Sequence, residues 1–131
     1  MSVSQVPSTL ILNVGQDLEL LRTRSLILRA RNYGVESCSI GEAFHRFRAG
    51  DFDLVILCHS VPQREREKLI LLIRDCGCST PVLFVAAASA DCPDRLANAS
   101  SRSEPRELLQ SIRDVLSVRH ILRGNTFARP Q

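Results

Sequence analysis

Lysine is almost absent from this 131-residue chain, and tryptophan is entirely absent. The 17 basic residues comprise Lys68 and sixteen arginines, which are spread along the sequence and interleaved with acidic residues, giving a net charge of +3. Dispersed charge of this kind is typical of a solvated surface, whereas nucleic-acid binders concentrate basic residues on one face. We therefore expect no nucleic-acid partner.

Long apolar runs are also missing, and none approaches the ~20 residues needed to span a bilayer. The first ten residues, MSVSQVPSTL, lack the basic start and apolar centre of a signal peptide. We expect a cytoplasmic protein without membrane contact. The length predicts one domain with a core large enough to need no covalent staples.

Paired cysteine motifs are absent, although the chain has five cysteines, at positions 38, 58, 76, 78 and 92. An odd number without a secretion signal favours reduced thiols over a disulfide framework. Cys76 and Cys78 are separated by one residue, and no second pair or matching histidine pair follows them. We therefore expect neither a structural metal nor any other cofactor.

Apolar runs and helical periodicities alternate along the chain. The strongest runs, 52–58 and 81–88, lack the polar alternation of a half-exposed strand, which indicates strands covered on both faces, as parallel strands are. Further strands are expected at 9–14 and 35–40, with a short polar one between 89 and 104, and helices at 17–34, 41–50, 63–77 and 104–122.

This alternation predicts an α/β fold with a doubly wound, five-stranded parallel sheet in the flavodoxin-like order 2-1-3-4-5. The helix between the fourth and fifth strands, which would be the fourth helix, should be shortened or missing. The domain should span 8–122, with an N-terminal extension at 1–7 and a flexible tail at 123–131. The order brings Gly15–Asp17 and Cys58 to one crevice at the carboxyl ends of the strands.

Cys58 ends the strongest strand, where ligands and chemistry sit in such sheets. As a free cysteine it is a candidate small buried hydrophobe. A redox-sensing or catalytic thiol would need an electropositive, partly exposed setting and a base within reach. His59 is poorly placed as that base, because successive residues of a strand point to opposite faces.

The segment DFDLVILCHSVP resembles the third strand of response-regulator receiver domains, in which an aspartate ends the strand and a proline follows four residues later. TPVLFVAA resembles their fourth strand, EPRELLQSI their last turn and helix, and LILNVGQDLELLRTRSLILRARNYGV their first strand and helix. The resemblance covers roughly residues 8–122. It implies the CheY-like fold and a family activity in which a histidine kinase phosphorylates the aspartate beside bound magnesium.

Each position that this resemblance assigns to phosphate chemistry carries a different group here. The phosphoacceptor position is Cys58, and the acidic pair falls at Gly15 and Gln16, with Asp17 displaced by one residue. The Ser/Thr position is Ala86, and the lysine position is Glu104, whose charge would repel a phosphate. Magnesium prefers carboxylate oxygens, which this set does not supply.

The sequence therefore indicates a stand-alone pseudo-receiver rather than an enzyme. It would act in two-component-type signalling by protein–protein interaction, without aspartate phosphorylation. Its partners would be other signalling proteins, such as a histidine kinase or a response regulator. A redox sensor or enzyme that uses Cys58 is the alternative, and a receiver with Ser60 or Asp17 as acceptor is a third reading.

Residues 69–73 are five consecutive apolar residues within one expected helix. A helix that covers a sheet buries only one stripe, so part of this run should be exposed or should contact a partner. The run favours self-association as a homodimer, with a helix sunk between its neighbours as the alternative.

Overall fold

A computed structural model describes residues 9–77, 79–86, 97, 99–102 and 104–128, without the side chains at 100, 102 and 119–128. Five parallel strands form one sheet in the order β2-β1-β3-β4-β5. The strands are β1 (Leu10–Val14), β2 (Gly34–Cys38), β3 (Leu54–Cys58), β4 (Val82–Ala86) and β5 (Ala99–Arg102), and the helices are α1 (Leu18–Arg29), α2 (Ile40–Ala49), α3 (Gln63–Asp75) and α4 (Pro105–Ala128).

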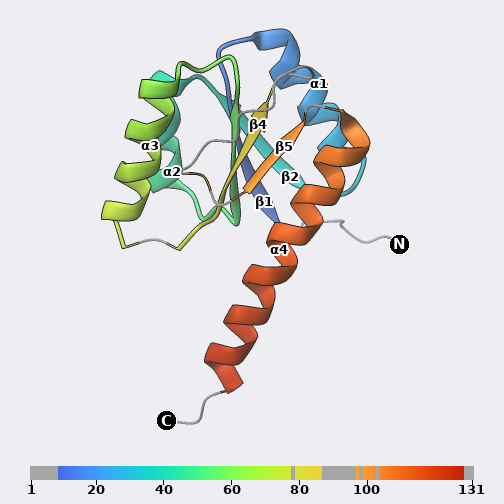
Figure 1. Ribbon diagram of the computed structural model, residues 1–131, viewed down its shortest axis with the longest axis vertical. Coiled ribbons are helices and arrows are strands. Elements are labelled where there is room, and N and C mark those ends of the chain that lie inside the picture. Colours follow the sequence, from blue (N-terminus) through green and yellow to red (C-terminus); the bar gives the residue numbers. More distant parts are fainter. Residues whose placement is uncertain (1–8, 78, 87–96, 98, 103, 129–131) are drawn as a thin grey trace.

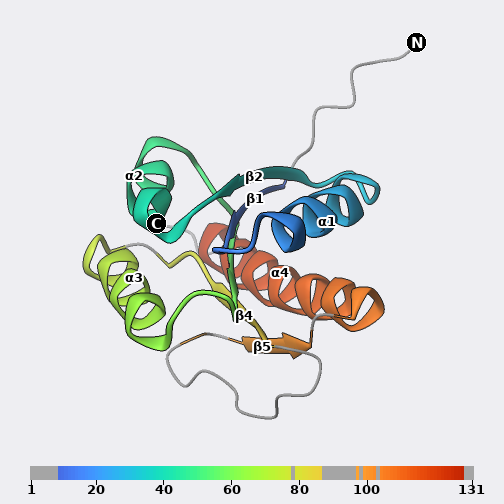
Figure 2. The same cartoon turned by 90° about the horizontal axis from the view of Figure 1, so that it is seen from above.

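The helices form two layers, with α1 and α4 on one face of the sheet and α2 and α3 on the other (Figures 1 and 2). Each face has its own apolar core. Alternate residues of β3 divide between them, so that Leu54 and Ile56 pack under α1 and α4, whereas Val55 and Leu57 pack under α2 and α3. Burial on both faces explains why β3 and β4 show no polar alternation.

The predicted order of the first four strands, β2-β1-β3-β4, is confirmed. Beyond β4, the four-residue segment Ala99–Arg102 continues the sheet as the edge strand β5. The strand predicted at 35–40 begins one residue earlier and ends two residues earlier, because α2 already begins at Ile40. The shortened or missing helix predicted before β5 falls on residues 87–96, which lie outside the described residues.

The last helix is longer than the sequence pattern predicts. The flexible tail was expected from residue 123, but the helical backbone of α4 continues to Ala128, and its second half projects away from the sheet (Figure 1). Periodicity does not find this extension, because residues 123–128 show no apolar helical pattern. Helix elongation gains one hydrogen bond per residue, and the next proline is Pro130.

The apolar run of α3 is partly exposed, as predicted. Leu69, Ile70 and Ile73 are buried against the sheet, whereas Leu71 and Leu72 are exposed. Within the described part of the chain, no helix is both long and apolar enough to cross a membrane.

Candidate functional site

Cys58 is completely buried at the carboxyl end of β3. The strand's alternation directs its side chain to the face that α1 and α4 cover. The Ser60 backbone N–H donates to Cys58 Sγ at 3.4 Å. A thiol without exposed surface reaches neither a phosphodonor nor an oxidant in this conformation.

Gly15 closes the space above Cys58. A Cβ atom placed on Gly15 would lie 3.1 Å from Cys58 Cβ and 3.1 Å from Leu21 Cδ2. Real Cβ atoms rarely make contacts this short, so the glycine permits close packing of the first loop against β3. The crevice predicted between Gly15 and Cys58 is therefore a contact between these two residues.

Gln16 and Ser60 join the two loops that would flank that crevice. The Gln16 backbone N–H donates to Ser60 Oγ at 2.9 Å, and Gln16 Oε1 accepts from the Ile40 backbone N–H at 3.3 Å. The Ser60 side chain thereby connects the loop after β3 to the loop after β1, and the Gln16 side chain connects the loop after β1 to the segment after β2. We call Gly15, Gln16, Cys58 and Ser60 the strand-end cluster.

Asp17 caps α1. Its Oδ1 accepts from the backbone N–H groups of Glu19 at 3.0 Å and Leu20 at 3.3 Å, which satisfies two of the donors that begin a helix. Its carboxylate is exposed and committed to the helix rather than directed at Cys58.

The strand-end cluster does not suit a magnesium ion. Gly15 has no side chain and no space for one, Gln16 Oε1 is committed to Ile40, and the sulfur of Cys58 is a soft ligand with no exposed surface. In the described part of the chain, no three histidine, cysteine, aspartate or glutamate residues are grouped closely enough to hold a metal ion.

Ala86 and Glu104, which stand at the expected Ser/Thr and lysine positions, lie apart in the chain and differ in burial. Ala86 ends β4 and is buried, with Arg102 as its partner in β5. Glu104 is exposed directly before α4, and its carbonyl oxygen accepts from the Leu108 N–H at 2.9 Å. Glu104 therefore starts the last helix through its backbone and presents a carboxylate to solvent.

His59 lies among positive charges at the same edge of the sheet. Partial burial lowers the pKa of His59 from its ordinary 6.5, and the nearby guanidinium groups of Arg24 and Arg66 lower it further, against an opposing effect of Asp17. Arg66 packs over the Phe84 ring and donates to the Val61 carbonyl oxygen. The neutral imidazole is favoured near pH 7.

The sequence analysis did not identify Arg24 or Asn13, which are both buried on the α1 side of the sheet. Arg24 is 3% exposed, and its two terminal nitrogens have no hydrogen-bond partner. Asn13 Nδ2 donates to the Leu21 carbonyl oxygen and to Ser37 Oγ, whereas its Oδ1 is unpartnered. A buried arginine within an arginine-rich chain carries no distinguishing sequence signal.

Cys38, at the end of β2, is the second buried thiol. Burial raises the pKa of Cys38 to about 11, because the nearby Arg46 only partly offsets desolvation of the thiolate. Its thiol therefore stays protonated at neutral pH. Cys76, in contrast, is exposed after α3.

No family model matches this chain, and no curated protein matches it. Solved structures do match it. The chemotaxis protein CheY4 of Vibrio cholerae is 18% identical, with a TM-score of 0.71, and the match covers 82% of this chain and 98% of that one. A putative response regulator from Chloroflexus aurantiacus is 23% identical, with a TM-score of 0.73 and coverage of 85% and 98%.

A signal receiver domain of an HD-domain-containing protein from Pseudomonas fluorescens matches 95% of this chain and 96% of its own length. Its TM-score is 0.73 at 20% identity. A structure of the histidine kinase ThkA in complex with the response regulator TrrA also matches, with a TM-score of 0.66, 20% identity and coverage of 82% and 98%. The chain therefore has the CheY-like fold of receiver domains, as predicted.

Proposed function

We propose that this protein is a pseudo-receiver, which takes part in two-component-type signalling by binding other proteins and does not accept a phosphoryl group. The fold supports a role of the receiver kind. Its neighbours of known structure are receiver domains, and one of them is seen with a histidine kinase. A histidine kinase or another response regulator is accordingly the proposed class of partner.

The burial of Cys58 carries the part of the proposal that concerns phosphorylation. Its sulfur is completely buried, and Gly15 packs against it where a phosphoryl group would need space. The hydrogen bond from Gln16 to Ser60 holds the adjoining loops together over this contact. Phosphoryl transfer depends on positioned acceptors and cations around the transferred group, and the strand-end cluster offers neither.

The alternative function, in which Cys58 senses oxidants or acts as a nucleophile, has less support. Both activities need an accessible thiolate. His59, the neighbouring base, follows Cys58 on the strand and donates its backbone N–H to the Val85 carbonyl oxygen at 2.9 Å, which still continues the sheet. Its side chain is thereby directed away from the Cys58 side chain.

Incubation with acetyl phosphate and magnesium tests the proposal. We expect no covalent phosphate in the intact mass, and no chemical-shift change at the strand-end cluster in beryllofluoride and magnesium. A receiver such as CheY4 serves as the positive control for both reagents. Phosphate incorporation on any residue, Ser60 and Asp17 included, would refute the proposal.

The variant Cys58→Asp restores the acceptor carboxylate alone. It tests whether the residues around position 58 also prevent phosphorylation. We expect it to stay unphosphorylated, because Ala86 and Glu104 stand at the expected hydroxyl and lysine positions and the strand-end cluster does not suit a magnesium ion. Circular dichroism checks that the variant folds, since an unpaired buried carboxylate is costly. Should it fail to fold, the wild-type assay still decides the proposal, and phosphorylation of a folded variant counts against it.

A further inference from the structure

A groove of about 740 Å³ lies between α1 and the outer strand β2. In the view of Figure 2, α1 lies between β2 and α4. The α1 wall of the groove carries Leu18 and Leu26, which are 71% and 69% exposed, the highest values among the large apolar side chains described. We call it the α1–β2 groove, lined chiefly by Leu18, Leu26, Arg29, Val35, Ser37 and Glu42.

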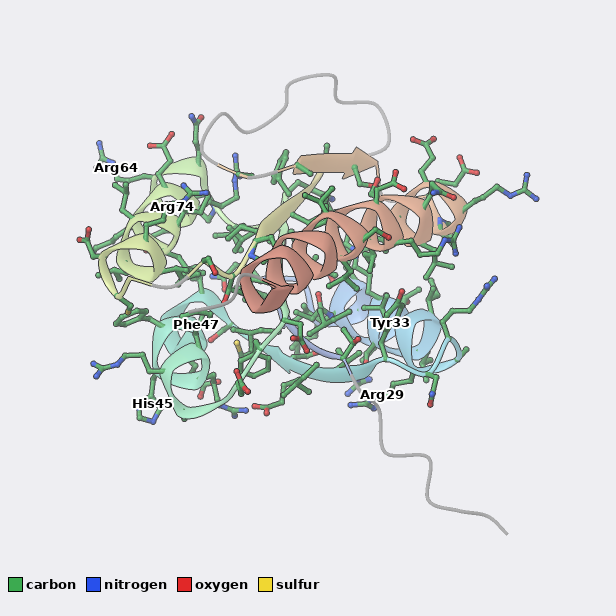
Figure 3. The ribbon with its side chains drawn as sticks, turned by 90° about the horizontal axis from the view of Figure 1, so that it is seen from below. Arg29, Tyr33, His45, Phe47, Arg64 and Arg74 are labelled. Atoms are coloured by element: carbon green, nitrogen blue, oxygen red, sulfur yellow. The ribbon has the colours of Figure 1, made fainter. Side chains whose placement is uncertain are left out.

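The groove runs along an open edge of the sheet. The Gly34 N–H donates to Thr9 and the Cys38 carbonyl oxygen accepts from Gly15, so the backbone groups of these two residues face β1. Because backbone groups alternate along a strand, those of Val35 and Ser37 face outward. In the described part of the chain, these outward backbone groups receive one hydrogen bond, from Arg29 Nη2 to the Val35 carbonyl oxygen at 3.0 Å. Figure 3 labels Arg29.

This edge has only part of the usual protection against strand pairing. β2 (GVESC) is short and carries the charged Glu36, but it contains no proline, lysine or bulge and pairs in regular register with β1. The carbonyl oxygen of Val35 has a second lone pair, so Arg29 leaves it able to accept another hydrogen bond. Four backbone groups at Val35 and Ser37 are thus suited to a further strand.

The charges along the groove are opposite at its two ends. Glu42 lies at the end near the carboxyl terminus of β2, in the first turn of α2. Arg29 lies at the other end, at the last turn of α1 beside Val35. Leu18 is at the acidic end and Leu26 is toward the basic end. If a second copy is turned end to end, the acidic end of one groove meets the basic end of the other, and Leu18 meets Leu26. The groove is therefore complementary to itself.

We propose that the α1–β2 groove is the interface of a homodimer, in which the β2 strands of two copies pair antiparallel across a twofold axis. Val35 of each copy then exchanges backbone hydrogen bonds with Ser37 of the other, which extends the sheet through both molecules. Leu18 of each copy packs against Leu26 of the other, and Glu42 approaches Arg29 of the other. This interface is independent of the proposed pseudo-receiver function.

The proposed twofold axis also brings two pairs of like charges together, Glu36 against Glu36 and Arg22 against Arg22 of the other copy. Glu36 faces its own copy, but each Glu36 already has an ion pair with Arg46 at 2.9 Å, which reduces the repulsion between the two carboxylates; Arg46 also lies 3.9 Å from Glu42. Arg22 lies between Leu18 and Leu26 on α1 and has no such partner in the described residues. The proposal therefore predicts that Arg22→Ala strengthens the dimer by a few-fold.

Sedimentation velocity over a wide concentration range tests the interface. We expect a reversible dimer of the wild-type protein, weakened on the order of 100-fold by Leu26→Glu. Each substituted leucine costs roughly tenfold, and twofold symmetry places it in the interface twice. Leu71→Glu is the matched control, since Leu71 is 52% exposed on α3, outside the groove, and it should leave the dimer intact.

Amide hydrogen exchange supplies an independent measurement. On raising the protein concentration, the amides of Val35 and Ser37 should become protected, whereas that of Gly34, which already donates within the sheet, should not change. A wild-type protein that remains monomeric would overturn the proposal, as would a dimer disrupted by Leu71→Glu but not by Leu26→Glu. A monomer that gains protection at these amides only with an added acidic peptide would also overturn it.

Discussion

At the scale of single residues, Cys58 and Gly15 act together. The sequence places a cysteine at the end of β3 and a glycine after β1, and the strand order brings both to one edge. The sequence does not show that they touch. That contact depends on how α1 packs Leu21 against Gly15 while β3 brings Cys58 to the same glycine, which no local pattern encodes. Likewise, the hydrogen bond between Gln16 Oε1 and the Ile40 N–H requires the segments after β1 and β2 to be placed first.

Thiol labelling distinguishes a packed Cys58 from a reactive one. We expect iodoacetamide to modify Cys76 of the folded protein quickly and to leave Cys58 and Cys38 almost unmodified, because both are buried. The pKa of Cys38, raised to about 11, further suppresses its thiolate at pH 8. Peptide mass spectrometry measures each cysteine separately.

The unfolded protein in urea provides the reference rate for every cysteine. If Cys58 reacts in the folded state as fast as in urea, or faster, the buried position described for its thiol is wrong. The redox or catalytic alternative would then regain support. Equal protection of Cys76 would instead show that burial does not control the labelling.

At the scale of elements, α1 and α4 illustrate what sequence patterns can find. The start of α1 was predictable, because Asp17 is a strong N-cap residue followed by an amphipathic stretch. The length of α4 was not, because its apolar stripe covers only the half that packs on the sheet, where Leu108 and Ile112 are fully buried. The projecting half has no such requirement.

Removal of the α1 cap should weaken the fold by a predictable amount. We expect Asp17→Ala to lower the free energy of unfolding by about 1 kcal/mol, since two backbone donors lose their acceptor. Asp17→Asn, which retains a side-chain oxygen, should cost less. Urea denaturation measures both, and equal losses in the two variants would contradict the capping role.

At the scale of the whole molecule, the order of strands and helices was recoverable because continuous apolar strands alternate with amphipathic helices. That pattern requires both faces of a parallel sheet to be covered, which leaves few arrangements. The buried positive charge at its carboxyl edge was not recoverable. Arg24 approaches His59 only once α1 lies across β1 and β3. The sequence does not single it out, because Arg24 is one of sixteen arginines.

This charge arrangement makes the stability of the molecule sensitive to acid. The pKa of His59 is lower in the folded protein than its ordinary 6.5, so below that pH the unfolded chain binds the proton first. Its contribution to stability is present above about pH 6.5 and is lost as the pH falls through the folded value. Between roughly pH 7 and pH 5, His59→Gln should therefore flatten the dependence of unfolding free energy on pH.

The exposed His45 of α2 offers the matched control (Figure 3). His45→Gln should leave the slope of the wild-type protein unchanged over the same range, as measured by urea denaturation at each pH. A slope that His59→Gln leaves intact would show that the acid sensitivity comes from other groups.

The close contact of Gly15 with Cys58 also constrains how this sequence can change. A side chain at position 15 would lie 3.1 Å from Cys58 Cβ, and an aspartate at position 58 would place its carboxylate at a completely buried position. Both substitutions add atoms to the same close contact, so neither one makes room for the other. The Gly15–Cys58 contact would have to rearrange before either change is accommodated, and the core itself therefore opposes a return to phosphoryl chemistry.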